Sequence, residues 1–308
     1  GVLPRALVQA VRDELRAVDA EVRPGYEAGA AGGQRRAASA LAADLQDFRR
    51  RHELARVVVV NVSSTEPPAA PHPATASLAE LESTLDGGVP VLPASAVYAY
   101  AALSAGCPYV DFTPSVGARL PALAELAARE RLPWAGNDGK TGETLVKAAL
   151  APMFAARALR VRSWAGTNLL GGGDGANLAD PEVAASKLAS KGGLLATVLG
   201  HPVTAPLHID HVPDLGEWKT AWDHVSFEGF LGARMSLQFT WQGCDSALAA
   251  PLVLDLARLV ARAHEAGETG PLGALGFFFK DPVGTDEQRL EAQYELLTRW
   301  AGELGSRP

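Results

Sequence analysis

The sequence predicts an α/β fold in which a doubly wound parallel sheet is joined to a second, α+β domain with a largely antiparallel sheet. Two observations carry this prediction. The first 140 residues alternate β-branched runs with helical patterns, and small polar loops follow the strands. Beyond them, strand patterns follow one another across short connections, which is typical of antiparallel pairing.

The first 52 residues are predicted to be helical. Leu41, Leu45 and Phe48 recur at helical spacing and form one apolar face. The glycine-rich stretch 29–33 interrupts this pattern and is predicted to be a loop between helices.

A nearly continuous β-branched run at 56–62 predicts a strand buried on both faces, as in a parallel sheet. The small polar loop 63–68 follows it, at the edge of the sheet where open α/β folds bind ligands. The pattern then repeats in two further units: helix 95–105 with strand 109–112 and loop 113–115, and helix 120–130 with the strand-end loop 136–139.

The rest of the chain is predicted to begin with a helix at 143–156 and a strand at 159–164. The elements expected after these are strands near 205–212, 222–230 and 233–242, an apolar helix at 246–265, an inner strand at 276–279 and an amphipathic helix at 285–303.

Size and charge restrict the class of protein. The 308 residues, 47% of them hydrophobic, suit one large domain or two of ordinary size. A net charge of −7 argues against nucleic acid as the principal partner. Residues 247–260 are too short and too charged for a membrane span, so no membrane partner is expected. Cys107 and Cys244 match neither a disulfide framework nor a zinc spacing, which favours a reducing compartment such as the cytoplasm.

The segment 136–144 leaves a predicted strand and opens a helix. Free amide groups at such a helix start, with the hydroxyls of Thr141 and Thr144, can bind an anion. Trp134 stands where a P-loop needs its first glycine, so this is not a P-loop. An ordinary N-cap is the alternative. The glycines in 168–175 allow a ligand to approach the backbone closely, or form a mobile turn.

The lysines are few in an arginine-rich background. There are 22 Arg and six Lys, and no Lys before residue 140. A retained lysine is a candidate for chemistry that arginine, which stays protonated, cannot perform, although surface lysines placed by chance are the alternative. Lys187 and Lys191 would share a helix face and lower each other's pKa. Lys280 directly follows three phenylalanines, so we expect burial to lower its pKa as well.

Other catalytic arrangements are not supported. His208 and Asp210 alternate on a predicted strand and could share a metal, but no further ligand stands at a telling spacing, so no metal site is expected. No Ser/His/Asp or Cys/His arrangement stands out.

Together these motifs resemble the inositol-phosphate synthase family, in particular its compact archaeal and bacterial branch. Several long strings in register are more specific than any one short pattern. The matching stretches occur in family order along nearly the whole chain: 59–67, 136–144, 168–175, 186–191, 212–219, 221–223, 227–232, 245–246, 249–251 and 277–282.

The resemblance implies a Rossmann-like dinucleotide-binding domain over 1–138, a catalytic and oligomerisation domain over 139–251, and a return to the first domain over 252–308. It also implies a homotetramer built on the antiparallel sheet. The family's first strand and glycine-rich dinucleotide loop have no counterpart here, and Gly1 stands in place of an initiator Met. We therefore expect the sequence to be part of a longer chain.

The activity implied by the resemblance is conversion of glucose 6-phosphate to inositol 1-phosphate by oxidation, enolisation, intramolecular aldol addition and re-reduction. NAD is the recycled cofactor, and the enzyme class is an intramolecular lyase or isomerase. Gly172, Gly173 and Glu217 depart from the family pattern near the cofactor and sugar. A cyclase of another sugar phosphate, such as fructose 6-phosphate, is therefore an alternative. A non-catalytic NAD-binding relative is a further one, and a simple dehydrogenase would differ by accumulating NADH.

The resemblance also assigns residues. The family's lysines match Lys187, Lys191, Lys219 and Lys280. Lys187 is expected to handle the C5 hydroxyl proton, Lys219 and Lys280 to stabilise developing negative charge, and Lys191 to help hold phosphate. The phosphate is expected at Thr141, Gly142, Glu143, Thr144 and Lys191. The NAD site is expected to be lined by Ser63, Ser64, Thr65, Thr113, Asp138, Thr141, Asp174, Asp245 and Ser246.

Overall fold

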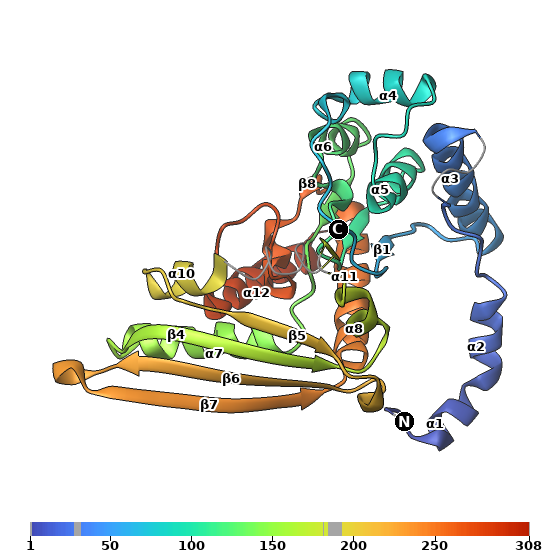
Figure 1. The fold of residues 1–308 in the computed structure, drawn as a ribbon. Coiled ribbons are helices and arrows are strands. Elements are labelled where there is room, and N and C mark those ends of the chain that lie inside the picture. Colours follow the sequence, from blue (N-terminus) through green and yellow to red (C-terminus); the bar gives the residue numbers. More distant parts are fainter. Residues whose placement is uncertain (1, 28–31, 181, 184–192, 308) are drawn as a thin grey trace.

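The computed structural model describes residues 2–27, 32–180, 182–183 and 193–307. Lys187 and Lys191, and the greater part of the predicted loop 29–33, lie outside the described residues. Figure 1 shows the long strands of one sheet lying beneath the helices that surround a second, shorter sheet.

The shorter sheet is parallel throughout. Its strands lie in the order β1-β2-β3-β8, and each pair of neighbours is parallel. Their bounds are β1 Val59–Asn61, β2 Tyr109–Asp111, β3 Pro133–Ala135 and β8 Gly270–Pro271. The predicted strand 56–62 is therefore shorter than expected, while β2 lies where the sequence placed it.

Helices cover both faces of this sheet, which confirms the doubly wound prediction. Tyr109 and Trp134 point into one apolar cluster, and Val110 and Ala135 point into another, because neighbouring strand residues alternate between faces. The helices on the first face are α4 Leu78–Asp86, α5 Ala94–Ser104 and α6 Pro121–Arg129, with α3 Gly33–Arg51 packed on α5. Those on the second face are α11 Asp245–Glu265 and α12 Leu290–Ser306.

The second sheet has the order β5-β4-β6-β7. Its bounds are β4 Arg160–Leu170, β5 Leu207–His211, β6 Lys219–Glu228 and β7 Arg234–Gly243. β6 pairs antiparallel with both β4 and β7, as predicted, whereas β4 and β5 are parallel. The long connection from β4 to β5 carries α8 Gly173–Leu178 and α10 Gly193–Leu199, and such a crossover is what a parallel pair needs.

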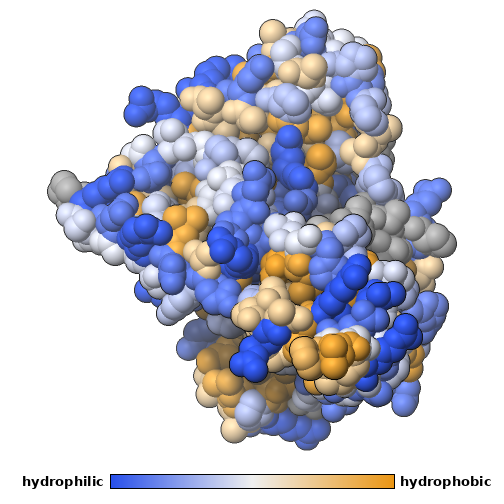
Figure 2. All heavy atoms as spheres, turned by 90° about the vertical axis from the view of Figure 1, so that its left-hand side faces the viewer, coloured by the Kyte–Doolittle hydropathy of each residue, from blue (hydrophilic) through white to orange (hydrophobic). Residues whose placement is uncertain are grey.

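Helix α7, Glu143–Ala156, covers one face of the second sheet and has the predicted bounds. Phe154 packs against Trp164 of β4, Phe227 of β6 and neighbouring apolar side chains. The turn that connects β6 to β7 is a short 3-10 helix. It exposes Phe230 and Leu231, whose side chains are 87% and 91% accessible. Figure 2 looks at this end of the β6–β7 hairpin and shows apolar residues gathered in its lower half, at the level of the hairpin.

One predicted strand is wrong. Residues 276–279 do not join the sheet, because Gly273–Phe278 forms a 3-10 helix, η5, and the last strand is β8 instead. An apolar run alone does not distinguish a buried strand from a buried helical turn. Here Gly273 lies so close to the backbone of Gly284 that a Cβ would be 2.3 Å from its carbonyl oxygen. The predicted burial is correct, since Phe278 and Phe279 are in the core.

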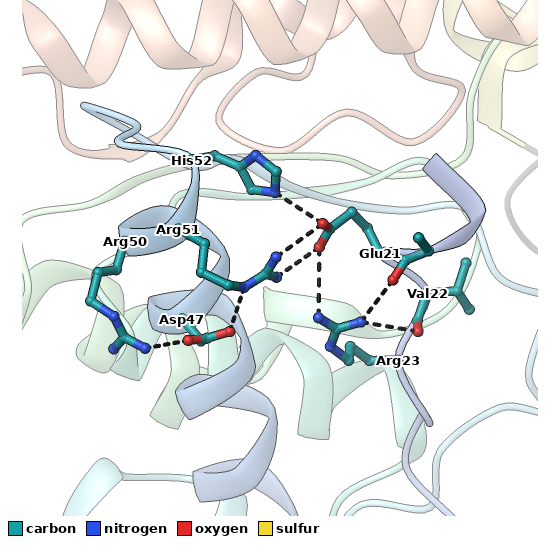
Figure 3. Close-up of polar contacts among 8 residues, drawn as sticks. Glu21, Val22, Arg23, Asp47, Arg50, Arg51 and His52 are labelled. Carbon is teal, nitrogen blue, oxygen red and sulfur yellow. Dashed lines mark hydrogen bonds and ion pairs between the residues drawn. The ribbon is translucent and has the colours of Figure 1, made fainter. Parts of the chain in front are cut away.

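The N-terminal helices α1 Arg5–Ala10 and α2 Arg12–Asp19 bury no residue. The segment that follows them is joined to the end of α3, as Figure 3 shows. Arg51 donates to both carboxylate oxygens of Glu21, at 2.9 and 2.7 Å, and also to Asp47 at 2.7 Å. These contacts are on the surface, so they fix the position of this segment but add little to the free energy of unfolding.

The remaining short 3-10 helices are η1 Pro73–Thr75, η2 Gly117–Arg119, η3 Pro213–Leu215 and η4 Phe230–Gly232. Among the described residues, no helix combines the length and the apolar character that a membrane span requires.

Candidate active site

A pocket of about 680 Å³ lies at the carboxyl ends of β1, β2 and β3, beside the first turns of α8 and α11. This is the edge at which open α/β sheets bind ligands, and the volume is in the range of small-molecule sites. Three strand-end loops contribute to its lining, including Ser63, Thr113 and Asp138.

Most of the predicted site residues meet in this pocket. Every residue predicted to line the NAD site is in its lining except Ser64, which is exposed next to it. Those present are Ser63, Thr65, Thr113, Asp138, Thr141, Asp174, Asp245 and Ser246, and Lys280 is with them. The apolar part of the lining is formed by Val62, Phe112, Pro114, Ala249, Ala250, Val253 and Leu254.

This division of the lining fits a dinucleotide. Carboxylates and hydroxyls accept hydrogen bonds from ribose hydroxyl groups, and the small side chains Ala249 and Ala250 leave room for a flat ring.

Lys280 reaches the pocket from the segment after η5. Its ammonium lies 2.7 Å from Asp138 Oδ1, and only 10% of its side chain is accessible. The two backbones are also joined, because the Lys280 amide donates to the Asp138 carbonyl at 2.8 Å. Asp138 has a φ of +60°, a left-handed conformation that is uncommon for a residue other than glycine.

The expectation that the Lys280 pKa is lowered is wrong. Burial is the largest single influence and acts to lower the pKa, but the carboxylates of Asp138, Asp245 and Glu143 together outweigh it, and the pKa is raised. An apolar sequence context predicts the burial of a lysine but says nothing about a carboxylate that arrives from another strand-end loop. Lys280 is therefore held as a charged group.

Lys219 opens β6 and points to the same region. Its ammonium lies 3.3 Å from Asp245 Oδ2, and Thr141 donates to the other oxygen of that carboxylate at 3.4 Å. Asp245 begins α11 and lines the pocket. Lys219 and Lys280 are thus each paired with a carboxylate of one pocket.

The predicted phosphate cradle lies at the start of α7. Gly142 is the N-cap, and as a glycine it provides no side-chain cap to this helix. The Glu143 carboxylate turns inward, where it accepts from Lys147 at 2.6 Å and from Asn168 at 2.7 Å. Thr144 is buried beside Glu143.

Of the two lysines outside the family match, Lys140 is buried and Lys147 is partly buried. Lys140 is 3% accessible, its ammonium donates to Gln293 Oε1 at 2.6 Å, and burial lowers its pKa to about 8. Lys147 bridges Glu143 and Asp223, at 2.6 and 3.2 Å. The scarcity of lysine in the sequence was the signal that could have identified both residues.

His208 and Asp210 form an exposed pair at 3.2 Å. Within the described ranges no group of three or more His, Cys, Asp or Glu side chains could hold a metal ion.

Comparison with known proteins places the chain among inositol-phosphate synthases. Residues 9–301 match the profile of the family described as Myo-inositol-1-phosphate synthase. The chain is 35% identical over 272 residues to an inositol-3-phosphate synthase of Bacteroides thetaiotaomicron, covering 84% of this chain and 62% of that protein. It is 33% identical over 261 residues to the human inositol-3-phosphate synthase 1, covering 78% of this chain and 46% of that protein. The chain thus spans less than two thirds of the length of these relatives.

Solved structures support the same placement. The crystal structure of a Caenorhabditis elegans inositol-3-phosphate synthase superposes with a TM-score of 0.85 at 24% identity, over 100% of this chain and 67% of that chain, which shows the fold. That of a myo-inositol-1-phosphate synthase-related protein from Thermotoga maritima gives 0.78 at 26% identity, over 91% and 73% of the two chains.

Proposed function

The chain belongs to the myo-inositol-1-phosphate synthase family, and from this we propose that it converts glucose 6-phosphate to inositol 1-phosphate with NAD as recycled cofactor. The observation that carries the proposal is that Lys280 and Lys219 lie, each paired with a carboxylate, around one pocket whose lining suits a dinucleotide. A binding protein without chemistry needs no such pair of buried ammonium groups.

Bound NAD would supply the hydride acceptor and donor that a redox-neutral cyclisation needs. The residues that would hold it are the hydroxyls and carboxylates of the strand-end loops, Thr65, Thr113, Asp138 and Asp174 among them, with Asp245 and Ser246 of α11.

The chain's own lysines handle charge. Oxidation at C5 releases a hydroxyl proton, and both enolisation and the aldol addition place negative charge on oxygen. Lys280 is charged and its neighbour Asp138 holds it in place, so it is suited to stabilise such an oxygen. Lys219 is suited to the same role at the other carbonyl. Lys187 as the group that exchanges the C5 hydroxyl proton, and Lys191 as a phosphate ligand, remain predictions.

We propose the division predicted from the sequence for the whole chain. The parallel sheet with 1–138 and 252–308 forms the dinucleotide-binding unit, and 139–251 forms the catalytic and oligomerisation unit. Helix α11, which begins at Asp245 and contacts β1 and β3, supports a close connection between the two.

We propose that the protein is a cytoplasmic homotetramer assembled through the second sheet. Apolar side chains on and beside β6 are exposed, including Trp218 at 45% and Trp222 at 43%. Exposed apolar patches of this kind indicate contact with another protein surface. Light scattering after size-exclusion chromatography tests this, and a monomer at micromolar concentration would contradict it.

A second substrate is tested in parallel because two residues that differ from the family pattern, Gly172 and Glu217, lie next to each other. A Cβ built on Gly172 would lie 3.4 Å from the carboxylate of Glu217, so both changes affect one place beside the pocket. The alternative is therefore a cyclase of another sugar phosphate, such as fructose 6-phosphate.

The deciding experiment incubates the protein and NAD with each hexose phosphate and follows carbon-13 labelled product by NMR. Formation of a cyclitol phosphate without accumulation of NADH supports the proposal, and the productive sugar identifies the substrate. Accumulating NADH would indicate a simple dehydrogenase. Absence of any product would indicate a non-catalytic NAD-binding relative.

A further inference from the structure

The indole of Trp241 has a buried N–H group with no acceptor. Its Nε1 atom is completely buried, and nothing in the described part of the chain accepts a hydrogen bond from it. Buried indole N–H groups normally have a partner, because desolvating a donor without one costs about 1–3 kcal/mol. A donor of this kind therefore indicates a ligand or an ordered solvent molecule at the same place.

The position of Trp241 follows from strand alternation. Leu237 and Phe239 of β7 belong to the apolar cluster beneath α7, and Trp241 is the next residue on that face. Continuing the row by one step brings the indole to the N-terminal end of α7. A Cβ built on Gly142, the N-cap of that helix, would be 2.7 Å from Trp241 Nε1 and 3.2 Å from Cε2. The nitrogen is thus the indole atom nearest to the helix start.

The surroundings favour an anion. The first amide groups of a helix carry partial positive charge, and the N-cap of α7, Gly142, has no side chain to cap them. The nearest helix carboxylate, that of Glu143, turns inward to Lys147 and Asn168. Lys219, which opens β6, is two positions along the ladder from the residue that pairs with Trp241. It adds a cation near the same end of the sheet.

We propose that the indole N–H of Trp241 donates a hydrogen bond to the substrate's phosphate group at the start of α7. The inference rests on the proposed function and deepens it, because it names a binding residue that favours phosphorylated over free sugars. It also explains Gly142, since any side chain there would meet the indole. Trp241 is a binding residue and takes no part in proton transfer.

The test replaces Trp241 by Phe, which keeps an aromatic ring but removes the donor. The matched control is Trp300→Phe, because Trp300 lies on α12, outside the second sheet and outside the pocket lining. Calorimetric titration of the whole protein with inorganic phosphate is expected to show about tenfold weaker binding for Trp241→Phe, as a charge-assisted hydrogen bond is worth about 1.5 kcal/mol or more. The control should bind as the wild type does. NAD affinity should be unchanged in both variants.

The outcomes separate this inference from the proposed function. Phosphate titration needs no turnover, so unchanged phosphate affinity in Trp241→Phe would overturn the inference even if the enzyme cyclises glucose 6-phosphate. Where turnover is measurable, KM should rise about tenfold while kcat changes little. If the variant folds poorly, the indole proton–nitrogen NMR signals of the wild type decide. Phosphate should shift the indole signal of Trp241 but not that of Trp164, whose N–H already donates to Asp223, and an unshifted Trp241 signal would refute the contact.

Discussion

Asp138 and Lys280 are joined twice, by an ion pair of 2.7 Å and by a backbone hydrogen bond of 2.8 Å from the Lys280 amide to the Asp138 carbonyl. The segments on either side of them are joined as well. Asn137 donates to the Asp281 carbonyl at 2.9 Å, and Lys140 donates to the Phe278 carbonyl at 2.8 Å. The ammonium of Lys280 therefore reaches the pocket from a rigid backbone, which is the precision that charge stabilisation requires.

Lys280→Met is expected to abolish cyclisation while NAD still binds. The thioether side chain fills similar space but cannot stabilise negative charge on a substrate oxygen. Stopped-flow absorbance at the NADH band and equilibrium NAD titration measure the two properties separately. Lys219→Met should behave in the same way. Turnover at the wild-type rate in both variants would exclude the lysine mechanism.

Gly139→Ala is expected to weaken NAD binding. A Cβ at this position would lie 2.1 Å from Phe112 Cζ, so the Phe112 ring must move, and Phe112 lines the pocket. The loss should be in NAD affinity, by about tenfold or more, with a smaller change in stability because a side chain rather than the backbone gives way. Gly302→Ala is the control, since neither glycine has a positive φ and a Cβ at Gly302 meets nothing within 4 Å. Equal affinity in Gly139→Ala and the control would contradict this reading.

Lys140→Met is expected to change the pH dependence of stability. Burial lowers the pKa of Lys140 to about 8, from a reference value of 10.5. Between these values the unfolded chain holds a proton that the folded chain lacks, so the lysine's contribution to stability rises with pH across this window. The full difference is on the order of 3 kcal/mol. Below pH 8 Lys140 is protonated in both the folded and the unfolded chain, so its contribution to stability stays at its lowest value.

Urea denaturation at pH 8 and pH 10 measures this effect as the difference between wild type and Lys140→Met. The wild type should gain stability relative to the variant as the pH rises. A constant difference would mean that the ammonium of Lys140 is solvated in the folded protein. Gln293→Leu, which removes the acceptor of the Lys140 hydrogen bond, should increase the pH dependence.

The sequence predicted those features that depend on local pattern. The strands β1 and β2 and helix α7 follow from β-branched runs and helical spacing. The family resemblance predicted a shared site for Ser63, Thr113 and Asp138, which all line one pocket. It erred at 276–279, where an apolar run forms a 3-10 helix because glycines allow close backbone approach.

Features that depend on distant partners could not be predicted. The raised pKa of Lys280 depends on Asp138, which is far away along the chain. Whether the Trp241 indole is buried depends on where α7 begins. The strand β7 on its own shows only an alternation of exposed and half-buried residues. The parallel pairing of β4 with β5 depends on how the segment between them crosses the sheet.

Lys147→Met is expected to destabilise the protein by about 3–5 kcal/mol, the usual cost of leaving a buried charge without its partner. Lys147 bridges two carboxylates, those of Glu143 and Asp223, whose side chains are 2% and 0% accessible. Burial already raises the pKa of Asp223, and removing Lys147 would raise it further. The folded variant should then bind a proton that the unfolded chain releases above pH 4, so its deficit should grow as the pH rises through the folded pKa. Chemical denaturation at pH 5 and pH 7.5 measures this, and Asp223→Asn in the same background should recover part of the loss. A deficit independent of pH, with no recovery, would show that Lys147 contributes packing rather than charge.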